Sequence, residues 1–241
     1  MDLQIAGKVA LVTAGSRGLG RGVALALAAE GARLMVSGRD GASLGSTRDE
    51  IAALGCDVDA RVGDLTDPAE PARLVAATVE RFGGLDILVA NAGGPPPGRS
   101  LDLTDEAIDG ALNANLKTSI RLVREALPHM RAAKWGRICC LTSYTVVQPA
   151  PTLALSNTAR TGLWAWIKTA AKDLAAEDGG ITLNMACPGP HATDRMKELG
   201  GDGVMGDPAD FGAVVAFLCS AQAGFVNGSA VVVDGGATLA L

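Results

Sequence analysis

Long basic runs, long apolar runs and a signal-peptide pattern are all missing from this 241-residue sequence. Its 21 basic and 26 acidic residues are interspersed and give a net charge of −5, so nucleic acid is not an expected partner. No stretch approaches the roughly 20 apolar residues of a membrane-spanning helix. Residues 1–8 have no apolar core, so no signal peptide is expected. We expect a soluble cytoplasmic protein that makes no membrane contact.

Cysteine pairs are also missing. The chain has five cysteines without the spacing of a disulfide framework or a metal site, namely Cys56, Cys139, Cys140, Cys187 and Cys219. A chain of this size needs no such crosslinks, because it can bury roughly three quarters of its unfolded surface. We therefore expect reduced, buried thiols and no metal site.

What the sequence does contain is a regular alternation of short apolar runs and longer helical patterns. The expected strands are 9–13, 34–36, 60–62, 85–90, 137–142, 181–186 and 230–233. The expected helices are 21–30, 41–54, 68–82, 105–134, 158–177 and 208–220, and Pro128 is expected to end or bend the fourth. The strands are apolar on both faces, as in a parallel sheet covered by helices on both sides.

No Pro/Ser linker or change in composition divides the chain, so we expect one domain over residues 1–241. Repeated strand–helix units with short connections predict an α/β fold with right-handed crossovers. The expected architecture is a doubly wound Rossmann domain. Its seven-stranded parallel sheet has the order 3-2-1-4-5-6-7, with helices on both faces.

A glycine-rich loop, Thr13–Gly20, joins the first expected strand to its helix. Glycines let the backbone approach a pyrophosphate closely, and the following helix directs its amide groups at that charge. This placement after the first strand of a βαβ unit predicts a dinucleotide site. The loop residues expected to bind the cofactor are Gly15, Ser16, Arg17, Gly18, Leu19 and Gly20.

The end of the second expected strand indicates which dinucleotide binds. An NAD site usually has a carboxylate there for the ribose 2′-hydroxyl, whereas an NADP site needs cations for the 2′-phosphate. This sequence has Gly38 at that point and Arg39 directly after it, and Arg17 in the glycine loop could reach the same phosphate. The sequence therefore favours NADP(H) over NAD(H).

The ordered motifs from Lys8 to Gly236 resemble those of the short-chain dehydrogenase/reductase family. The family's first loop glycine is Ala14 here, and the first Asn of its Asn-Asn-Ala-Gly motif is Ala90. The resemblance implies further cofactor contacts, which are Asp64 and Leu65 at the adenine, then Asn91, Ala92, Gly93, Pro188, Gly189, Thr193 and Arg160. It also implies that Asn115 holds a proton-relay water and that Ser143 is the catalytic serine.

The sequence departs from the family at the pair that normally supplies the proton. Thirteen residues after the serine the family has Tyr-x-x-x-Lys, but here Ser156 replaces the tyrosine and Arg160 the lysine. A phenol with a pKa near 10 can be brought toward neutrality by a cation, whereas a serine hydroxyl cannot. Arg160 could still hold the nicotinamide ribose, so cofactor binding is expected to survive better than catalysis.

Other groups could supply the proton instead. Tyr144 is the only tyrosine and directly follows Ser143. His191 follows Pro188-Gly189, and histidine is the residue type that most readily exchanges a proton near neutral pH. The alternatives are Ser156 through water, Tyr144 or His191, whereas His129 is expected to be structural. The divergent window and the Gly94–Gly98 proline insertion resemble an offshoot of the family labelled 3-oxoacyl-carrier-protein reductase-like, which lacks the Tyr–Lys pair.

Two functions follow from this sequence. The first is an NADP(H)-dependent oxidoreductase for a small-molecule carbonyl or alcohol, with catalytic residues Asn115, Ser143, Ser156 and Arg160. The second is a catalytically silent NADP(H)-binding protein, acting as a sensor or as a subunit. The sequence names no substrate.

The resemblance also implies a homotetramer or homodimer, paired through the helices expected at 105–131 and 158–177 and through the last strand. Trp164, Trp166 and Ile167 could supply apolar surface for this pairing, or they could fill the core.

Overall fold

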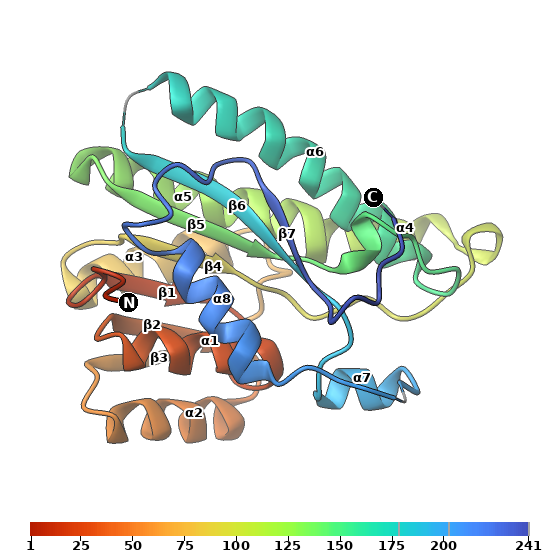
Figure 1. The fold of residues 1–241 in the computed structure, drawn as a ribbon, viewed down its shortest axis with the longest axis horizontal. Helices are drawn as coiled ribbons and strands as arrows, with labels where there is room; N and C mark the ends of the chain where they lie inside the picture. The colour runs from red at the N-terminus through yellow and green to blue at the C-terminus, as the bar shows by residue number, and fades with distance from the viewer. Residues whose placement is uncertain (178, 202, 241) are drawn as a thin grey trace.

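The computed structural model describes residues 1–177, 179–201 and 203–240, and seven parallel strands form its central sheet (Figure 1). The strands are β1 (Val9–Val12), β2 (Arg33–Gly38), β3 (Val58–Val62), β4 (Ile87–Ala90), β5 (Gly136–Leu141), β6 (Ile181–Pro188) and β7 (Ala230–Val233). Their order is β3-β2-β1-β4-β5-β6-β7, and every neighbouring pair is parallel. The predicted fold and strand order are confirmed.

Helices cover both faces of the sheet, as Figure 1 shows. They are α1 (Gly18–Ala29), α2 (Gly41–Ala53), α3 (Glu70–Phe82), α4 (Asp105–Leu112), α5 (Thr118–Ala133), α6 (Ala154–Ala176), α7 (Asp194–Glu198) and α8 (Pro208–Leu218). Short 3-10 turns occur at η1 (Ser100–Asp102) and η3 (Tyr144–Val146), and a π-helical turn at η2 (Asn113–Lys117). One core cluster joins the sheet to α3, α5 and α6, and the other joins it to α1, α2 and α8.

The long helical region predicted over 105–134 differs from the prediction at two places. The π-helical turn η2 interrupts it, with one extra residue in the turn. Pro128, in contrast, does not end α5, which continues to Ala133. Pro128 and Arg124, whose carbonyl lacks its usual partner, both lie on the exposed face of α5, where water can solvate that carbonyl.

Helix α6 begins at Ala154, four residues before the predicted start, and α7 was not predicted at all. Of the apolar residues on α6, Ile167 is fully buried, so of the two alternatives left open by the sequence it fills the core and adds no outward surface. Trp164 and Trp166 are partly buried and pack against the same core cluster. Among the described residues, no helix combines the length and apolar character needed to cross a membrane.

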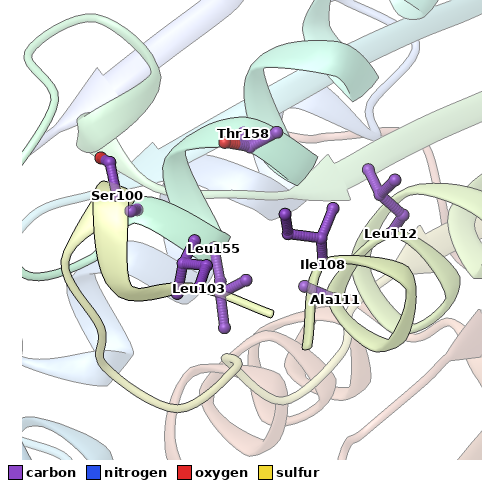
Figure 2. A pocket seen from close by; sticks show the side chains of 8 residues that line it. Ser100, Leu103, Ile108, Ala111, Leu112, Leu155 and Thr158 are labelled. Atoms are coloured by element: carbon purple, nitrogen blue, oxygen red, sulfur yellow. The ribbon is translucent and has the colours of Figure 1, made fainter. Parts of the chain in front are cut away.

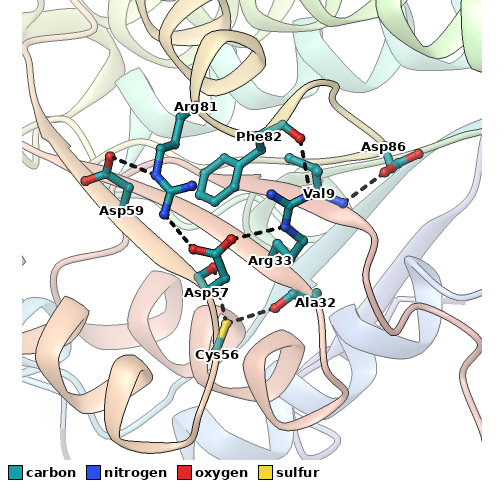
Figure 3. A network of polar contacts seen from close by, with 9 residues as sticks. All are labelled: Val9, Ala32, Arg33, Cys56, Asp57, Asp59, Arg81, Phe82 and Asp86. Carbon is teal, nitrogen blue, oxygen red and sulfur yellow. Dashed lines mark hydrogen bonds and ion pairs between the residues drawn. The ribbon is translucent and has the colours of Figure 1, made fainter.

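A network of charges stabilises the amino edge of the sheet, at the end opposite the predicted site (Figure 3). Asp57 lies between Arg33 and Arg81, with Nε–Oδ2 and Nη2–Oδ1 distances of 3.2 and 2.6 Å. Both guanidinium groups also lie over the ring of Phe82, 5.1 and 4.5 Å from its centre. Hydrogen bonds from the two arginines are the largest factors lowering the pKa of Asp57 against the effect of its partial burial. This network is structural and leaves the carboxyl edge for the site.

Helices α1 and α8 approach closely enough that two glycines are required where they cross. A Cβ atom on Gly212 would stand 2.5 Å from the carbonyl oxygen of Gly22, and one on Gly22 would collide with the carbonyl oxygen of Pro208. Because α1 carries the glycine loop at its N-terminus, this contact also fixes the position of that loop.

We predict that Gly212→Ala destabilises the fold by about 1–3 kcal/mol, because the two backbones must separate to admit the methyl group. Gly45→Ala on α2 is the matched control. A Cβ there meets nothing within 4 Å, so it should stabilise the protein by about 0.5–1 kcal/mol. The measurement is urea unfolding of both variants. Equal stability of the two variants would contradict this account of the α1–α8 contact.

Candidate active site

The glycine loop lies at the carboxyl edge of β1 and is fixed to its neighbours by backbone hydrogen bonds. The amide of Gly15 donates to the carbonyl oxygen of Ser37 at the end of β2, at 2.8 Å. Gly18 has a φ of +54°, which favours glycine, and Ala14 has a φ of +46°. Ala14 therefore keeps the left-handed backbone expected of the glycine it replaces, at a steric cost of roughly 1–2 kcal/mol.

Asn91 joins the glycine loop to the end of β4. Its Nδ2 donates to the carbonyl oxygen of Ala14 at 3.3 Å, and its backbone exchanges two hydrogen bonds with the Thr13 hydroxyl, at 2.7 and 2.8 Å. A Cβ on Gly20 would collide with the same carbonyl of Ala14. The structure thus brings together loop residues 15–20 and Asn91, as the sequence predicts, with Ala92 and Gly93 following directly.

Arg17 lies in this loop, Arg39 directly follows β2, and both side chains are exposed. A ribose 2′-phosphate is expected beside them. Neither Arg17 nor Arg39 forms an ion pair with any residue that the structure describes. Asp40 instead caps α2, where its Oδ1 accepts from the amide of Ser43 at 2.7 Å. Hydrogen bonds from Ser43 lower the pKa of Asp40, with a smaller effect of Arg17. The cations therefore remain available to an anion.

The adenine end of the predicted site lies after β3. Hydrogen bonds from the backbone and hydroxyl of Thr66 are the main reason that the pKa of Asp64 is lowered, and Arg39 adds a smaller effect. The carbonyl oxygen of Leu65 accepts from the Thr118 hydroxyl at 2.9 Å. This contact connects the adenine loop to the start of α5, directly after η2.

Asn115 lies within η2 and is 3% exposed. Both polar atoms of its side chain are buried without a hydrogen-bond partner among the described residues. Buried amides are rarely left unsatisfied, so this side chain fits a site that a water or a cofactor group completes. Two residues away, Asn113 donates to the carbonyl oxygen of Thr66 at 2.9 Å and fixes the turn.

Ser143 follows β5, and its hydroxyl oxygen accepts two hydrogen bonds from Thr145. The amide of Thr145 lies 3.2 Å away and its hydroxyl 3.0 Å away. Since the oxygen of Ser143 already accepts twice, its own proton is left to donate to another group. Thr145 is fully buried, and its role could not be read from the sequence.

Arg160 lies one helical turn after Ser156 on α6, and both side chains are buried. Its Nη1 donates to the carbonyl oxygens of Leu141 and Thr142, at 3.0 and 2.8 Å, and so holds the end of β5. The pKa of Arg160 is lowered to about 10, mainly by burial and to a smaller extent by the nearby charge of Arg195. The contact of Arg160 with the cofactor ribose stays a prediction.

The two alternative proton donors differ in their surroundings. His191 is 4% exposed, with Nδ1 3.0 Å from the carbonyl oxygen of Gly189 and the ring edge-on to Phe211 at 5.3 Å. This packing supports the loop after β6. Tyr144 is half-buried at the start of η3, and no hydrogen bond of its hydroxyl is present in the described part of the chain. His129 is half-buried on α5.

The segment after β6 lies across the glycine loop. A Cβ on Gly189 would collide with Asp234, and one on Gly18 would stand 3.4 Å from the methyl group of Thr193. The hydroxyl of Thr193 caps α7 by accepting from the amide of Met196 at 3.3 Å. Thr193 therefore contacts the glycine loop at Gly18, beside the position expected for the pyrophosphate.

Beside α6, an apolar cavity of about 140 Å³ lies between η1, α4 and the first turns of α6 (Figure 2). Leu103, Ile108 and Leu155 point into it, and Ser100 and Thr158 lie at its border. Across residues 1–177, 179–201 and 203–240, no group of three or more His, Cys, Asp or Glu side chains is placed to hold a metal ion.

The family model described as enoyl-(acyl carrier protein) reductase matches residues 13–238. Dehydrogenase/reductase SDR family member 4 of Homo sapiens is 32% identical over 246 residues, covering 96% of this chain and 88% of that protein. Versicolorin reductase 1 of Aspergillus parasiticus is 33% identical over 258 residues, covering 96% of each.

Solved structures agree with these sequence matches. L-Sorbose reductase from Gluconobacter frateurii, complexed with NADPH and L-sorbose, superposes with a TM-score of 0.93 at 29% identity, covering all of both chains. A dehydrogenase/reductase from Sinorhizobium meliloti 1021 gives a TM-score of 0.89 at 31% identity, covering 98% of this chain and 97% of that one. The fold, the order of the motifs along the chain and these matches show that the chain belongs to the short-chain dehydrogenase/reductase family.

Proposed function

We propose that this protein is an NADP(H)-dependent oxidoreductase that acts on a carbonyl or alcohol, with Ser156 and Arg160 in place of the family's tyrosine and lysine. The observation that carries the proposal is Ser143, whose hydroxyl proton is free to bind a substrate oxygen. This hydroxyl stands on the same edge of the sheet as the glycine loop. A polarising donor beside a dinucleotide site is the arrangement that carbonyl reduction needs.

Different residues are proposed to contact the different parts of the cofactor. Arg39 and Arg17 bind the 2′-phosphate, the glycine loop and Thr193 enclose the pyrophosphate, and Asp64 and Leu65 border the adenine. Two features fit a bound dinucleotide. The buried side-chain amide of Asn115 has no hydrogen-bond partner among the described residues, and the glycines of the loop allow close approach to the backbone. The chemistry that NADPH supplies when bound is a hydride.

The remaining residues of the chain position the substrate and the proton. Ser143 donates a hydrogen bond to the substrate oxygen, which favours the negative charge that develops there. Arg160 holds Ser143 in place through the carbonyls of the two preceding residues. Neither Ser156 nor Arg160 is an acid of suitable pKa, so the proposed source of the proton is water near Asn115 and Ser156, with Tyr144 and His191 as the alternatives.

Relatives support this class of reaction. The L-sorbose reductase structure contains NADPH and a sugar, and versicolorin reductase 1 is named as a reductase. The actinorhodin polyketide ketoreductase structure, 30% identical with a TM-score of 0.89, also contains NADPH. A small-molecule carbonyl or alcohol is accordingly the proposed substrate.

A homotetramer is the proposed assembly. Strand β7 is the last strand of the sheet, and its apolar residues are partly exposed. Phe225 is fully exposed close to the start of β7, and Phe217 on α8 is 38% exposed. An unpaired strand edge with exposed apolar side chains is a surface that a second copy can cover.

A second candidate function is a catalytically silent NADP(H)-binding protein. The observation that favours it is the use of Arg160, whose Nη1 is committed to two backbone carbonyls in place of a proton relay. In this case the cofactor residues serve sensing or assembly, and no substrate is turned over.

We predict that NADPH binds more tightly than NADH and that Arg39→Ala weakens NADPH binding about tenfold or more, because a charge-assisted contact to the phosphate is lost. NADH binding should stay almost unchanged. Arg48→Ala, which removes an exposed arginine paired with Asp49, is the control and should leave both affinities unchanged. Calorimetry measures the affinities of the unmodified protein and of both variants for the two cofactors. Equal affinity of the unmodified protein for the two cofactors would rule out the NADP preference.

Restoring the family's Tyr–Lys pair distinguishes the two proposed functions, an enzyme and a catalytically silent binder. Ser156→Tyr with Arg160→Lys should raise carbonyl reduction about 10²–10⁴-fold, because a general acid near neutrality is regained. Ser156→Tyr alone should recover part of this gain, since Arg160 still lowers the pKa of the new phenol. The measurement is NADPH oxidation across ketones, aldehydes, quinones and acyl thioesters.

Thermal unfolding and NADPH affinity are the controls for these variants, because Lys at position 160 loses hydrogen bonds at the end of β5. A double variant that folds and binds NADPH normally, yet reduces no carbonyl above background, would favour the silent binder.

A further inference from the structure

Arg195, on α7, reaches across the mouth of the proposed site. Its Nη2 donates to the carbonyl oxygen of Pro95 at 2.6 Å, and its Nε lies 3.3 Å from where a Cβ on Gly94 would stand. Residues 94 and 95 follow β4, whereas α7 follows β6. Nothing in the sequence patterns pointed to Arg195, because α7 is short and the contact joins residues 100 positions apart.

The topology places this contact over Ser143. Strand β5 pairs with β4 on one side and with β6 on the other. A hydrogen bond between the segment after β4 and the segment after β6 therefore passes over the carboxyl end of β5, which Ser143 follows. Arg195 is thus placed at the carboxyl edge of the sheet, on the same side as the Ser143 hydroxyl.

The charge of Arg195 is poorly compensated. Its acidic partner is Glu198, three residues along α7, whose Oε2 lies 3.5 Å from Nη1 and whose side chain is 61% exposed. Ion pairs of this kind contribute little in water. The partner of Nη2, the carbonyl of Pro95, carries no net charge.

A second guanidinium faces the same region. The charge of Arg195 acts on buried Arg160, which pairs with no carboxylate among the described residues and keeps an unpartnered Nε. Two like charges near each other, without a carboxylate between them, raise each other's free energy. An anion at this place would relieve both.

We infer that Arg195 binds a carboxylate of the substrate, so that the carbonyl compounds this site prefers are oxo acids. This inference rests on the proposed oxidoreductase function and names its substrate class. The planar guanidinium matches a carboxylate with two parallel hydrogen bonds, and the carboxylate replaces the neutral carbonyl of Pro95 as its acceptor. Ser143 meanwhile contacts the oxygen of the carbonyl to be reduced.

The reaction is a two-electron reduction. The carbonyl carbon gains a hydride from NADPH and its oxygen gains a proton from water, which gives the hydroxy acid and NADP⁺. The carboxylate is unchanged, because it only holds the substrate.

The test compares oxo acids with their uncharged esters. Pyruvate, 3-oxobutanoate and 4-oxopentanoate are offered beside their methyl esters to the full-length protein with saturating NADPH, and kcat/KM is measured. Binding of the same compounds to the protein–NADP⁺ complex is measured by calorimetry. For at least one pair we expect the acid to be favoured about tenfold or more, the usual scale of one charge-assisted contact.

The variants assign that preference to one side chain. Arg195→Met should abolish it, and Arg195→Lys should keep part of it. Lys197→Met is the matched control, because Lys197 is a cation of the same helix, exposed and paired with Asp194 at 3.2 Å. It should keep the full preference.

Each outcome decides a different claim. Turnover of esters and acids at equal rates would overturn the inference and leave the proposed function standing, and so would an acid preference that survives Arg195→Met. If none of these compounds is turned over, the wider carbonyl screen decides the proposed function, and the binding measurement still decides the inference. Acids that bind no better than esters would then overturn it.

Discussion

Two hydrogen bonds from the buried guanidinium of Arg160 hold the end of β5, and the geometry of the active site depends on them. They fix the carbonyls of Leu141 and Thr142, and with them the position of Ser143. The family resemblance implies a lysine at this position, which lowers the pKa of the tyrosine and holds the nicotinamide ribose. Here the longer, forked side chain acts as a brace for the backbone. Its burial is costly without a carboxylate, and the lowered pKa of Arg160 reports that cost.

The contacts that position the cofactor-binding loop do not include Arg160. Thr13, Asn91 and Gly20 lock the glycine loop against β4, and the close contact of Gly22 with Gly212 fixes the helix behind it. None of these contacts involves Ser156 or Arg160, the positions where the family's Tyr–Lys pair is replaced. A change at residues 156 and 160 can therefore alter the proton chemistry without disturbing the dinucleotide cradle. Because the two parts are separate, cofactor binding is expected to survive the replacement of the family's Tyr–Lys pair better than catalysis does.

The strands and helices were predictable because apolar, β-branched runs are local patterns. The strand order was predictable because it goes with the doubly wound fold class that their alternation indicates. The points that the sequence left open concern features set by tertiary contacts. Pro128 continues a helix because its face is exposed, and Ile167 is core because α6 lies flat on the sheet. Within the site, motif positions such as Asn91 and Ser143 were found from spacing. Thr145 and Arg195 were not, since their partners are recognised only once the chain is folded.

The account's central claim is that no ionisable side chain of this site supplies the proton. The most direct measurement is kcat for carbonyl reduction against pH at saturating NADPH. Between about pH 6 and 9 neither a serine hydroxyl nor Arg160, with its pKa of about 10, changes its charge. The account predicts a profile without a side-chain ionisation in this range. A clear break there, removed by substitution of His191 or Tyr144, would contradict it and assign the proton to that residue.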